Sequence, residues 1–190
     1  AGATAFILGK ENIISTIEEA YSYSGFFVDY VTSDNVVQVY QQNFVEDQGY
    51  ATFVSRSVNG LLEKTGKSIA DFGHVMIQAP NERALGRIAK KLGCKENQLS
   101  GRDILQSIGY LGMNSIFMVL AKLLPSLPPG EEVLMVSYGS GASTAFQMKM
   151  TSNVSGNNRE SDDFEKNKKY VDYLTYLRYQ GLIEKEKELR

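Results

Sequence analysis

Three stretches of the chain place apolar residues at the spacing of an amphipathic helix. Between residues 49 and 64 apolar side chains recur every three or four positions, which predicts a helix that ends at Gly66. A second helix is expected to begin after Asn81, a residue type that caps helix N-termini, and to end at Gly93. A third helix, almost entirely apolar, is expected over residues 115–124 and is followed by a proline.

Other stretches have the composition and the flanking turns of β-strands. Residues 73–78 predict a buried strand, and residues 133–138 and 143–150 predict a hairpin around a glycine-rich turn. Shorter strands are expected over residues 1–9, which are small and apolar, and over residues 26–31. Because strands and helices alternate along most of the chain, the sequence favours an α/β layered architecture.

The segments between these elements are more polar. Residues 35–45 predict a surface loop, and Ser100–Asp103 has the pattern of a capping box at a helix start. Residues 151–162 are rich in Ser, Asn and Gly and predict a mobile loop. The aromatic and basic stretch over residues 164–179 predicts a tail that is helical in its first part.

Composition narrows the class of protein. With 190 residues, 43% hydrophobic and 22% charged, the chain suits one soluble domain. A net charge of -2 gives no basic excess for nucleic acid, and no apolar run approaches the roughly 20 residues that cross a bilayer. The first residues lack the features of a signal peptide, and a single cysteine fits a reducing compartment. We therefore expect a cytoplasmic protein with no nucleic-acid or membrane partner.

Three short motifs carry a family resemblance. They are Gln78-Ala79-Pro80-Asn81 after a strand, Ile108-Gly109-Tyr110, and the turn Ser137-Tyr138-Gly139-Ser140-Gly141-Ala142. In order and spacing they resemble the second half of a thiolase-superfamily enzyme of the hydroxymethylglutaryl-CoA synthase type. The resemblance covers roughly residues 1–150, and the ending over residues 169–181 is similar to the carboxyl end of archaeal-type members. It implies the C-terminal half of a thiolase-like fold, with α/β/α layers and a mixed sheet.

The chain departs from the family at two positions of the implied catalytic site. The family carries His-Gln-Pro-Asn where the first motif of this chain has Gln78 in its first position. It carries Ile-Gly-Asn where the second motif of this chain has Tyr110 in its last position. Glutamine donates a hydrogen bond but cannot carry a proton through a cycle, whereas a tyrosine hydroxyl can donate to a substrate oxygen. The alternatives are a polar strand-end residue at 78, a packing tyrosine at 110, and Asn114 as the amide in place of Tyr110.

Four further residues are candidates for substrate binding. Asn81 starts a helix whose amide end favours negative charge. The turn residues Gly139, Ser140 and Gly141 bring backbone amides close to a ligand, and the resemblance places this turn beside the active-site floor.

Other chemically active side chains have a structural interpretation. His74 lies four residues before Gln78, roughly 13 Å away along a strand at about 3.3 Å per residue, which favours a structural histidine. Cys94 is expected to be an inert thiol, although flanking lysines favour a modestly lower pKa. One His and one Cys cannot form a zinc site from this chain alone, so we expect no metal. Four basic residues of one helix either face solvent or meet a coenzyme A phosphate: Arg83, Arg87, Lys90 and Lys91.

The resemblance also implies an organisation and a function. Residues 1–9 would be the end strand of the N-terminal thiolase half, residues 10–150 the C-terminal thiolase-like domain, and residues 151–190 a mobile loop and tail. We expect a subunit of a heteromeric enzyme that makes or breaks a carbon–carbon bond on a coenzyme A thioester, either synthase-like or aldolase-type, without a bound cofactor. One partner would carry the complementary N-terminal half. A zinc-ribbon/OB-fold acyl-CoA-binding protein would be a second partner. The alternative is a catalytically degenerate subunit that completes an active homologue.

Overall fold

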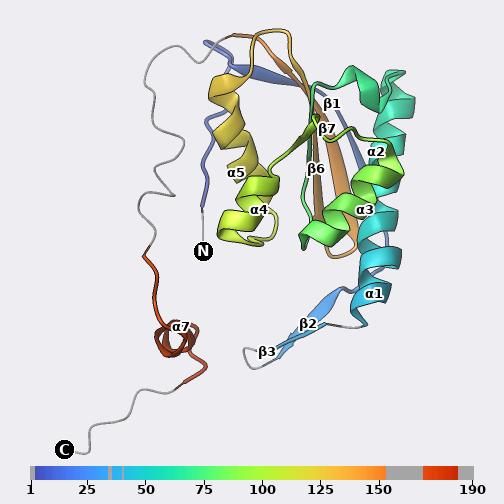
Figure 1. Ribbon diagram of the computed structural model, residues 1–190. Coiled ribbons are helices and arrows are strands. Elements are labelled where there is room, and N and C mark those ends of the chain that lie inside the picture. The colour runs from blue at the N-terminus through green and yellow to red at the C-terminus, as the bar shows by residue number, and fades with distance from the viewer. Residues whose placement is uncertain (1–2, 34–35, 40, 153–168, 184–190) are drawn as a thin grey trace, which may run out of the picture. The chain divides into compact units, whose positions relative to one another are not determined.

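A computed structural model describes residues 3–33, 36–39, 41–152 and 169–183. The chain divides into two compact units, Ala1–Gly156 and Asn157–Arg190. The first unit is a mixed β-sheet covered by helices on both faces (Figure 1). The predicted α/β/α layers and mixed sheet are thereby confirmed. In the second unit, the described residues form one helix, α7 (Tyr173–Tyr179).

The main sheet has five strands in the order β1-β7-β6-β4-β5. The central strand β6 (Glu132–Gly139) runs parallel to β4 (His74–Ile77) and antiparallel to its hairpin partner β7 (Ala142–Met150). The edges are β1 (Ser15–Ser24), antiparallel to β7, and the short β5 (Leu99–Ser100), parallel to β4. A separate antiparallel ribbon is formed by β2 (Tyr30–Ser33) and β3 (Val36–Val39).

Helices cover both faces of the sheet (Figure 1). Helices α2 (Thr52–Thr65) and α3 (Glu82–Leu92) lie on one side, and α4 (Arg102–Ile108) and α5 (Asn114–Leu123) lie on the other. Alternate strand residues point to opposite faces, and because helices cover both faces, β4 and β6 are buried on both sides. The core between the sheet and helices α2 and α3 contains Val54, Val58, Val75, Leu85, Ile88, Leu134 and Val136.

Three predicted helix boundaries are confirmed. Gly66 and Gly93 end helices α2 and α3 in the left-handed conformation, with φ of 68° and 78°. The Asn81 side chain caps α3, because its Oδ1 accepts a hydrogen bond of 2.8 Å from the backbone N–H of Ala84. The predicted capping box at Ser100–Asp103 is wrong: α4 begins at Arg102 without a side-chain cap. Ser100 belongs to β5, and its hydroxyl lies 3.0 Å from His74 Nδ1.

Helix α2 is preceded by a short helix and a π-helical turn that the sequence pattern did not indicate. The short helix α1 (Gln42–Phe44) leads into the π-helical turn η1 (Val45–Ala51), which continues directly into α2. Single π-turns in helices are often found at functional sites. Short 3₁₀ turns η2 (Ile69–Asp71) and η3 (Leu124–Ser126) precede β4 and follow α5.

Several element predictions in the first third of the chain are wrong. Residues 3–9 form no strand, and the first strand is β1, which was not predicted. Only the end of the predicted strand over residues 26–31 belongs to β2, and the predicted loop over residues 35–45 contains β3 and α1. Each of these strands is polar or short. It forms because it pairs with a neighbouring strand, and its own residue pattern does not predict it.

In the tail, the described residues 169–172 are not helical, and helix α7 occupies residues 173–179. The helix predicted for the first part of residues 164–179 falls mostly outside the described residues. Residues 153–168 lie outside the described part of the chain, as does most of the predicted mobile loop. Across the part of the chain that the structure describes, no helix combines the length and apolar character needed to cross a membrane.

Candidate active site

The two positions that depart from the family pattern meet at the end of β4. Gln78 follows that strand directly and is 3% exposed. Its Nε2 donates to the Tyr110 hydroxyl at 3.2 Å and to the backbone oxygen of Tyr138 at 2.8 Å. Its Oε1 accepts from the backbone N–H of Tyr138 at 3.1 Å. The side-chain amide therefore pairs with the backbone of β6 and holds Tyr110 beside it.

Tyr110 lies in the turn between α4 and α5 and is half exposed. Burial raises the pKa of Tyr110, the hydrogen bond from Gln78 lowers it, and the nearby Tyr30 and Asp29 raise it further. The net direction is upward, so the hydroxyl is protonated at neutral pH. Because its oxygen accepts from Gln78, its own proton remains available for another acceptor.

Tyr138 links this site to the segment before β2. Its hydroxyl donates to Asp29 Oδ1 at 2.7 Å, and both side chains are buried. Burial raises the pKa of the Asp29 carboxyl, and the hydrogen bond from Tyr138 opposes that shift without cancelling it. Asp29 is therefore fixed in position by a neutral donor rather than by a cation.

The β6–β7 turn holds the Asp29 segment in place. The backbone N–H of Asp29 donates to Ser140 Oγ at 3.1 Å, and the N–H of Gly25 donates to the Gly141 oxygen at 2.9 Å. The predicted substrate-binding turn Gly139–Gly141 thus anchors another part of the chain. Substrate contact by these residues stays a prediction.

A cavity of about 320 Å³ opens between these elements. Four tyrosines and two carboxyl groups dominate its wall, and the lining is Asp29, Tyr30, Gln42, Val45, Glu46, Tyr50, Gln78, Pro80, Tyr110 and Tyr138. The cavity therefore contains both predicted catalytic residues, Gln78 and Tyr110. The four predicted binding residues Asn81, Gly139, Ser140 and Gly141 are not part of its wall.

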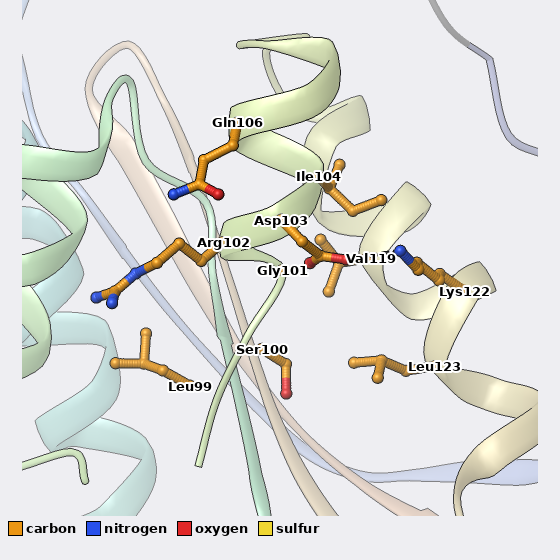
Figure 2. Close-up of a pocket in the computed structure, with 10 residues that line it drawn as sticks. All are labelled: Leu99, Ser100, Gly101, Arg102, Asp103, Ile104, Gln106, Val119, Lys122 and Leu123. Atoms are coloured by element: carbon orange, nitrogen blue, oxygen red, sulfur yellow. Dashed lines mark hydrogen bonds and ion pairs between the residues drawn. The ribbon is translucent and has the colours of Figure 1, made fainter. Parts of the chain in front are cut away.

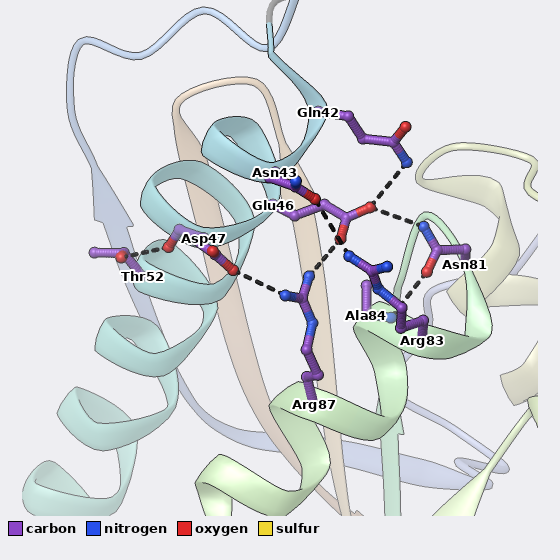
Figure 3. A network of polar contacts seen from close by, with 9 residues as sticks. All are labelled: Gln42, Asn43, Glu46, Asp47, Thr52, Asn81, Arg83, Ala84 and Arg87. Carbon is purple, nitrogen blue, oxygen red and sulfur yellow. Dashed lines mark hydrogen bonds and ion pairs between the residues drawn. The ribbon is translucent and has the colours of Figure 1, made fainter.

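A polar network behind the cavity wall fixes Glu46 (Figure 3). The carboxylate of Glu46 accepts from Gln42 Nε2 and Asn81 Nδ2, each at 3.0 Å, and pairs with Arg87. Burial would raise the pKa of Glu46, but those hydrogen bonds and the charges of Arg87 and Arg83 hold it below its usual value. Glu46 is therefore ionised at neutral pH although it is 4% exposed.

Two of the four basic residues predicted on one helix face, Arg83 and Arg87, belong to the same network. Arg87 also pairs with Asp47 at 3.1 Å, and Arg83 donates to Asn43 Oδ1 at 3.2 Å (Figure 3). Arg83 thus bridges α3 to α1, and Arg87 bridges α3 to η1. Lys90 and Lys91 are exposed, as expected for a solvated face.

A second, larger cavity of about 460 Å³ lies beside β5, α4 and α5 (Figure 2). Its three charged side chains all form ion pairs: Lys122 with Asp103 at 2.6 Å, and Arg102 with Glu96 at 3.1 Å. It contains none of the motif residues at the end of β4. We therefore place the candidate site in the tyrosine-lined cavity.

Three other candidates lie away from that cavity. His74 begins β4, at the opposite end from Gln78, and contacts Ser100 as described above. Asn114 starts α5, and its Oδ1 accepts from the Thr4 hydroxyl at 2.6 Å. Burial raises the pKa of the Cys94 thiol to about 11, which is opposite to the modest lowering expected from flanking lysines. These three side chains therefore lie in structural environments outside the cavity.

Replacing Cys94 by Ser should leave turnover of the assembled protein within about twofold, because the thiol is protonated at neutral pH and lies outside the cavity. Steady-state turnover on an acyl-CoA substrate, together with mass spectrometry for an acyl adduct, measures this. An adduct that disappears in the Cys94→Ser protein would instead make Cys94 the nucleophile.

Asp29, Glu46 and Tyr50 are among the cavity residues that were not predicted as site residues. Tyr50 was interpreted only as an apolar position of a helix, and Glu46 lies where helical periodicity had not begun. Asp29 reaches the site through its contacts with Tyr138 and Ser140, more than one hundred residues away in the chain. No local sequence signal marks such contacts.

Comparison with known proteins shows which proteins this chain resembles. The sequence profile of the 3-oxoacyl-[acyl-carrier-protein (ACP)] synthase III C-terminal family matches residues 62–149. A hydroxymethylglutaryl-CoA synthase of Archaeoglobus fulgidus is 34% identical over 189 residues, which cover 96% of this chain and 54% of that protein. The chain thus matches the C-terminal half of thiolase-superfamily proteins. The homologue from Methanosphaera stadtmanae is 30% identical with the same coverage, so the chain spans about half the length of these curated relatives.

Solved structures agree on the fold. The 3-oxoacyl-[acyl-carrier-protein] synthase III of Aquifex aeolicus superposes with a TM-score of 0.64 at 16% identity, over 74% of this chain and 46% of that one. Xanthomonas campestris OleA gives a TM-score of 0.63 at 15% identity, over 71% and 40% of the two chains. The chain therefore has the fold of a C-terminal thiolase half, as the motifs predicted.

Proposed function

We propose that this chain forms part of a thiolase-fold enzyme that makes or breaks a carbon–carbon bond on a coenzyme A thioester. Its sequence relatives are named hydroxymethylglutaryl-CoA synthases, and its structural relatives include 3-oxoacyl-[acyl-carrier-protein] synthases. The reaction would be synthase-like or of the aldolase type, with the thioester as substrate and no cofactor held by this chain.

The observation that carries the proposal is the hydrogen bond from Gln78 to Tyr110. It orients the Tyr110 hydroxyl so that its proton points to a third atom, which we assign to the substrate oxygen. Negative charge develops on that oxygen when a bond next to a carbonyl is made or broken, and a fixed donor stabilises it. Tyr110 is thus the proposed catalytic residue, and Gln78 is the positioning residue.

The nucleophile and the proton-carrying base would come from residues outside this chain. The described residues that line the cavity include no cysteine and no histidine. We propose that a complementary N-terminal thiolase half supplies them, on another subunit of a heteromeric cytoplasmic enzyme. A zinc-ribbon/OB-fold acyl-CoA-binding protein would deliver the thioester.

Exposed apolar residues support a missing neighbour. Ile7 and Leu8 are 100% and 90% exposed, and Ile17 of the edge strand β1 is 57% exposed. Exposed apolar side chains on an edge strand and on a segment outside the sheet are typical of interaction sites or aggregation-prone regions.

Expressed alone, the chain should therefore aggregate or elute as large assemblies, whereas co-expression with its genomic neighbours should give a defined complex. Size-exclusion chromatography with mass identification of co-purifying proteins tests this. A cooperative thermal transition of a stable monomer would contradict the requirement for a partner.

One observation favours a second candidate function, that of a catalytically degenerate subunit. Both polar atoms of the Gln78 amide pair with the backbone of Tyr138, which is a structural use of the position. In that case the chain would complete an active thiolase-family partner without chemistry of its own. A partner with an intact site of its own would favour this candidate, and a partner with only the N-terminal half would favour the first.

A further inference from the structure

The carboxylate of Glu46 joins the wall of the tyrosine-lined cavity to helix α3. Its Oε1 accepts from Gln42 Nε2 and from Asn81 Nδ2, each at 3.0 Å. Its Oε2 pairs with Arg87, which lies in α3 (Figure 3). Glu46 is 4% exposed, so protein groups rather than water compensate its charge.

Asn81 carries the effect of Glu46 toward the two predicted catalytic residues. It follows Gln78 by three positions, and Pro80 between them lines the cavity. Its Oδ1 caps α3 and its Nδ2 donates to Glu46, so the side chain fixes the start of the helix against η1. The ring of Pro80 restricts the short connection to Gln78. A shift of Asn81 would therefore move Gln78 together with the Tyr110 hydroxyl that it holds.

The charge of Glu46 depends on Arg87. Burial raises the pKa of Glu46, but the hydrogen bonds from two amides and then the charges of Arg87 and Arg83 hold it below its ordinary value. Arg87 contacts the carboxylate directly, whereas Arg83 donates to Asn43. Without a cation, a buried carboxylate takes up a proton, and the protonated oxygen is then a donor that an amide N–H cannot pair with.

We propose that Arg87 is a positioning residue of the candidate site: by pairing with the buried Glu46 carboxylate, it holds Asn81 in place. Asn81 in turn keeps Gln78 and Tyr110 in the geometry that the reaction needs, and small displacements of such groups cost much of the rate. This inference rests on the proposed function, because it adds a residue outside the cavity to the same site. The Arg87 side chain is 42% exposed and is not part of the cavity wall, so it acts on a substrate only through its neighbours.

Other titratable or charged groups surround Glu46 and contribute to any pH profile of the site. They belong to η1, to α3 and to the cavity wall: Asp47 and Tyr50; Arg83, Arg87 and Lys91; Asp29, Tyr30, Tyr110 and Tyr138. Burial raises the pKa of the Asp29 carboxyl, which therefore takes up a proton in the same acid range. Asp29 is present in every variant compared below, so a difference between variants does not come from its titration.

Arg87→Met tests the proposal on the full chain together with the protein that co-purifies with it. In the parent protein the lowered pKa keeps Glu46 charged until the pH falls below the ordinary carboxyl range. In the variant burial dominates, so the pKa of Glu46 rises and the contact with Asn81 is lost at a higher pH. Turnover is measured as release of the coenzyme A thiol from acetyl-CoA with acetoacetyl-CoA.

Between about pH 7.5 and about pH 5.5, kcat should fall about 10-fold more in Arg87→Met than in the parent protein. The KM for the thioester should stay within about twofold, because Arg87 does not reach the cavity. Arg87→Lys keeps a cation and should restore most of the parent profile. A purely structural ion pair would lower the amount of folded protein without moving the pH dependence of kcat.

Two further variants are controls. Lys64→Met breaks the ion pair with Glu19, at 2.8 Å and outside the cavity wall, and should leave the profile of kcat unchanged. Adding Glu46→Gln to Arg87→Met replaces the carboxyl by a carboxamide, whose oxygen still accepts from Asn81 and which does not titrate. The double variant should therefore lose the additional decline in acid.

The side-chain amide of Gln78 gives a readout that needs no turnover. In protein labelled with ¹⁵N-glutamine, its resonance should shift between about pH 7.5 and about pH 5.5 in Arg87→Met and stay in place in the double variant. An Arg87→Met profile and Gln78 resonance like those of the parent would overturn the inference. An inactive parent protein would overturn the proposed function instead, and the Gln78 resonance would then decide the inference alone.

Discussion

Replacing Tyr110 by Phe should lower turnover by about 100- to 1000-fold if its hydroxyl stabilises charge on a substrate oxygen. The hydroxyl is held by Gln78 Nε2 at 3.2 Å, so it is oriented before substrate arrives. The phenylalanine ring fills the same space, and the half-exposed position makes the change mild for folding. Steady-state turnover of the assembled protein on an acyl-CoA substrate is the measurement, with assembly checked by size-exclusion chromatography.

Tyr23→Phe is the matched control for this variant. It removes a tyrosine hydroxyl from β1, outside the cavity wall, and should leave turnover unchanged. Full activity of a properly assembled Tyr110→Phe protein would remove the aldolase-type mechanism. The degenerate-subunit function would then be the better account of the chain.

Replacing Gly141 by Ala should destabilise the fold by about 2–4 kcal/mol. Gly141 has a φ of 73°, which strains any residue with a side chain, and an added Cβ would lie 2.7 Å from the backbone oxygen of Gly25 and 3.0 Å from that of Phe27. Those oxygens belong to the backbone that positions Asp29, so they cannot rotate away as a side chain would. The free energy of unfolding by urea, measured on the assembled protein, reports the loss.

Gly93→Ala separates the two causes of that loss. Gly93 has a similar φ of 78°, but an added Cβ there meets nothing within 4 Å. It should cost only about 1 kcal/mol, from backbone strain alone. Equal losses in the two variants would show that the Asp29 segment yields to the new methyl group and is not rigidly held by the turn.

Elements with their own chemical signals were predictable from the sequence. Asn81 and Gly93 bound α3 because side-chain capping and left-handed glycine are local effects. The hairpin β6–β7 followed from two apolar runs around a glycine-rich turn. By contrast, β1 carries a mixed burial pattern with a register shift between Ile17 and Glu19, so neither alternation nor composition marked it.

The candidate site was predictable only where a motif marked it. Gln78 and Tyr110 were placed in one site from their motif positions, and the structure brings them into hydrogen-bond distance. Asp29, Glu46 and Tyr50 were not recognised, because each one enters the cavity through packing between segments distant in sequence. Glu46 in particular depends on a π-helical turn, which has no sequence signature of its own.

The double pairing of Gln78 with Tyr138 limits how the site can change over evolutionary time. A carboxamide presents its N–H and its oxygen side by side, and so pairs with both backbone groups of one residue. An imidazole carries its two nitrogens on diverging sides of a ring and cannot reproduce that arrangement. A single Gln78→His substitution would therefore leave the buried backbone N–H or C=O of Tyr138 without its present partner. A histidine at this position would require a second change that pairs the freed backbone group.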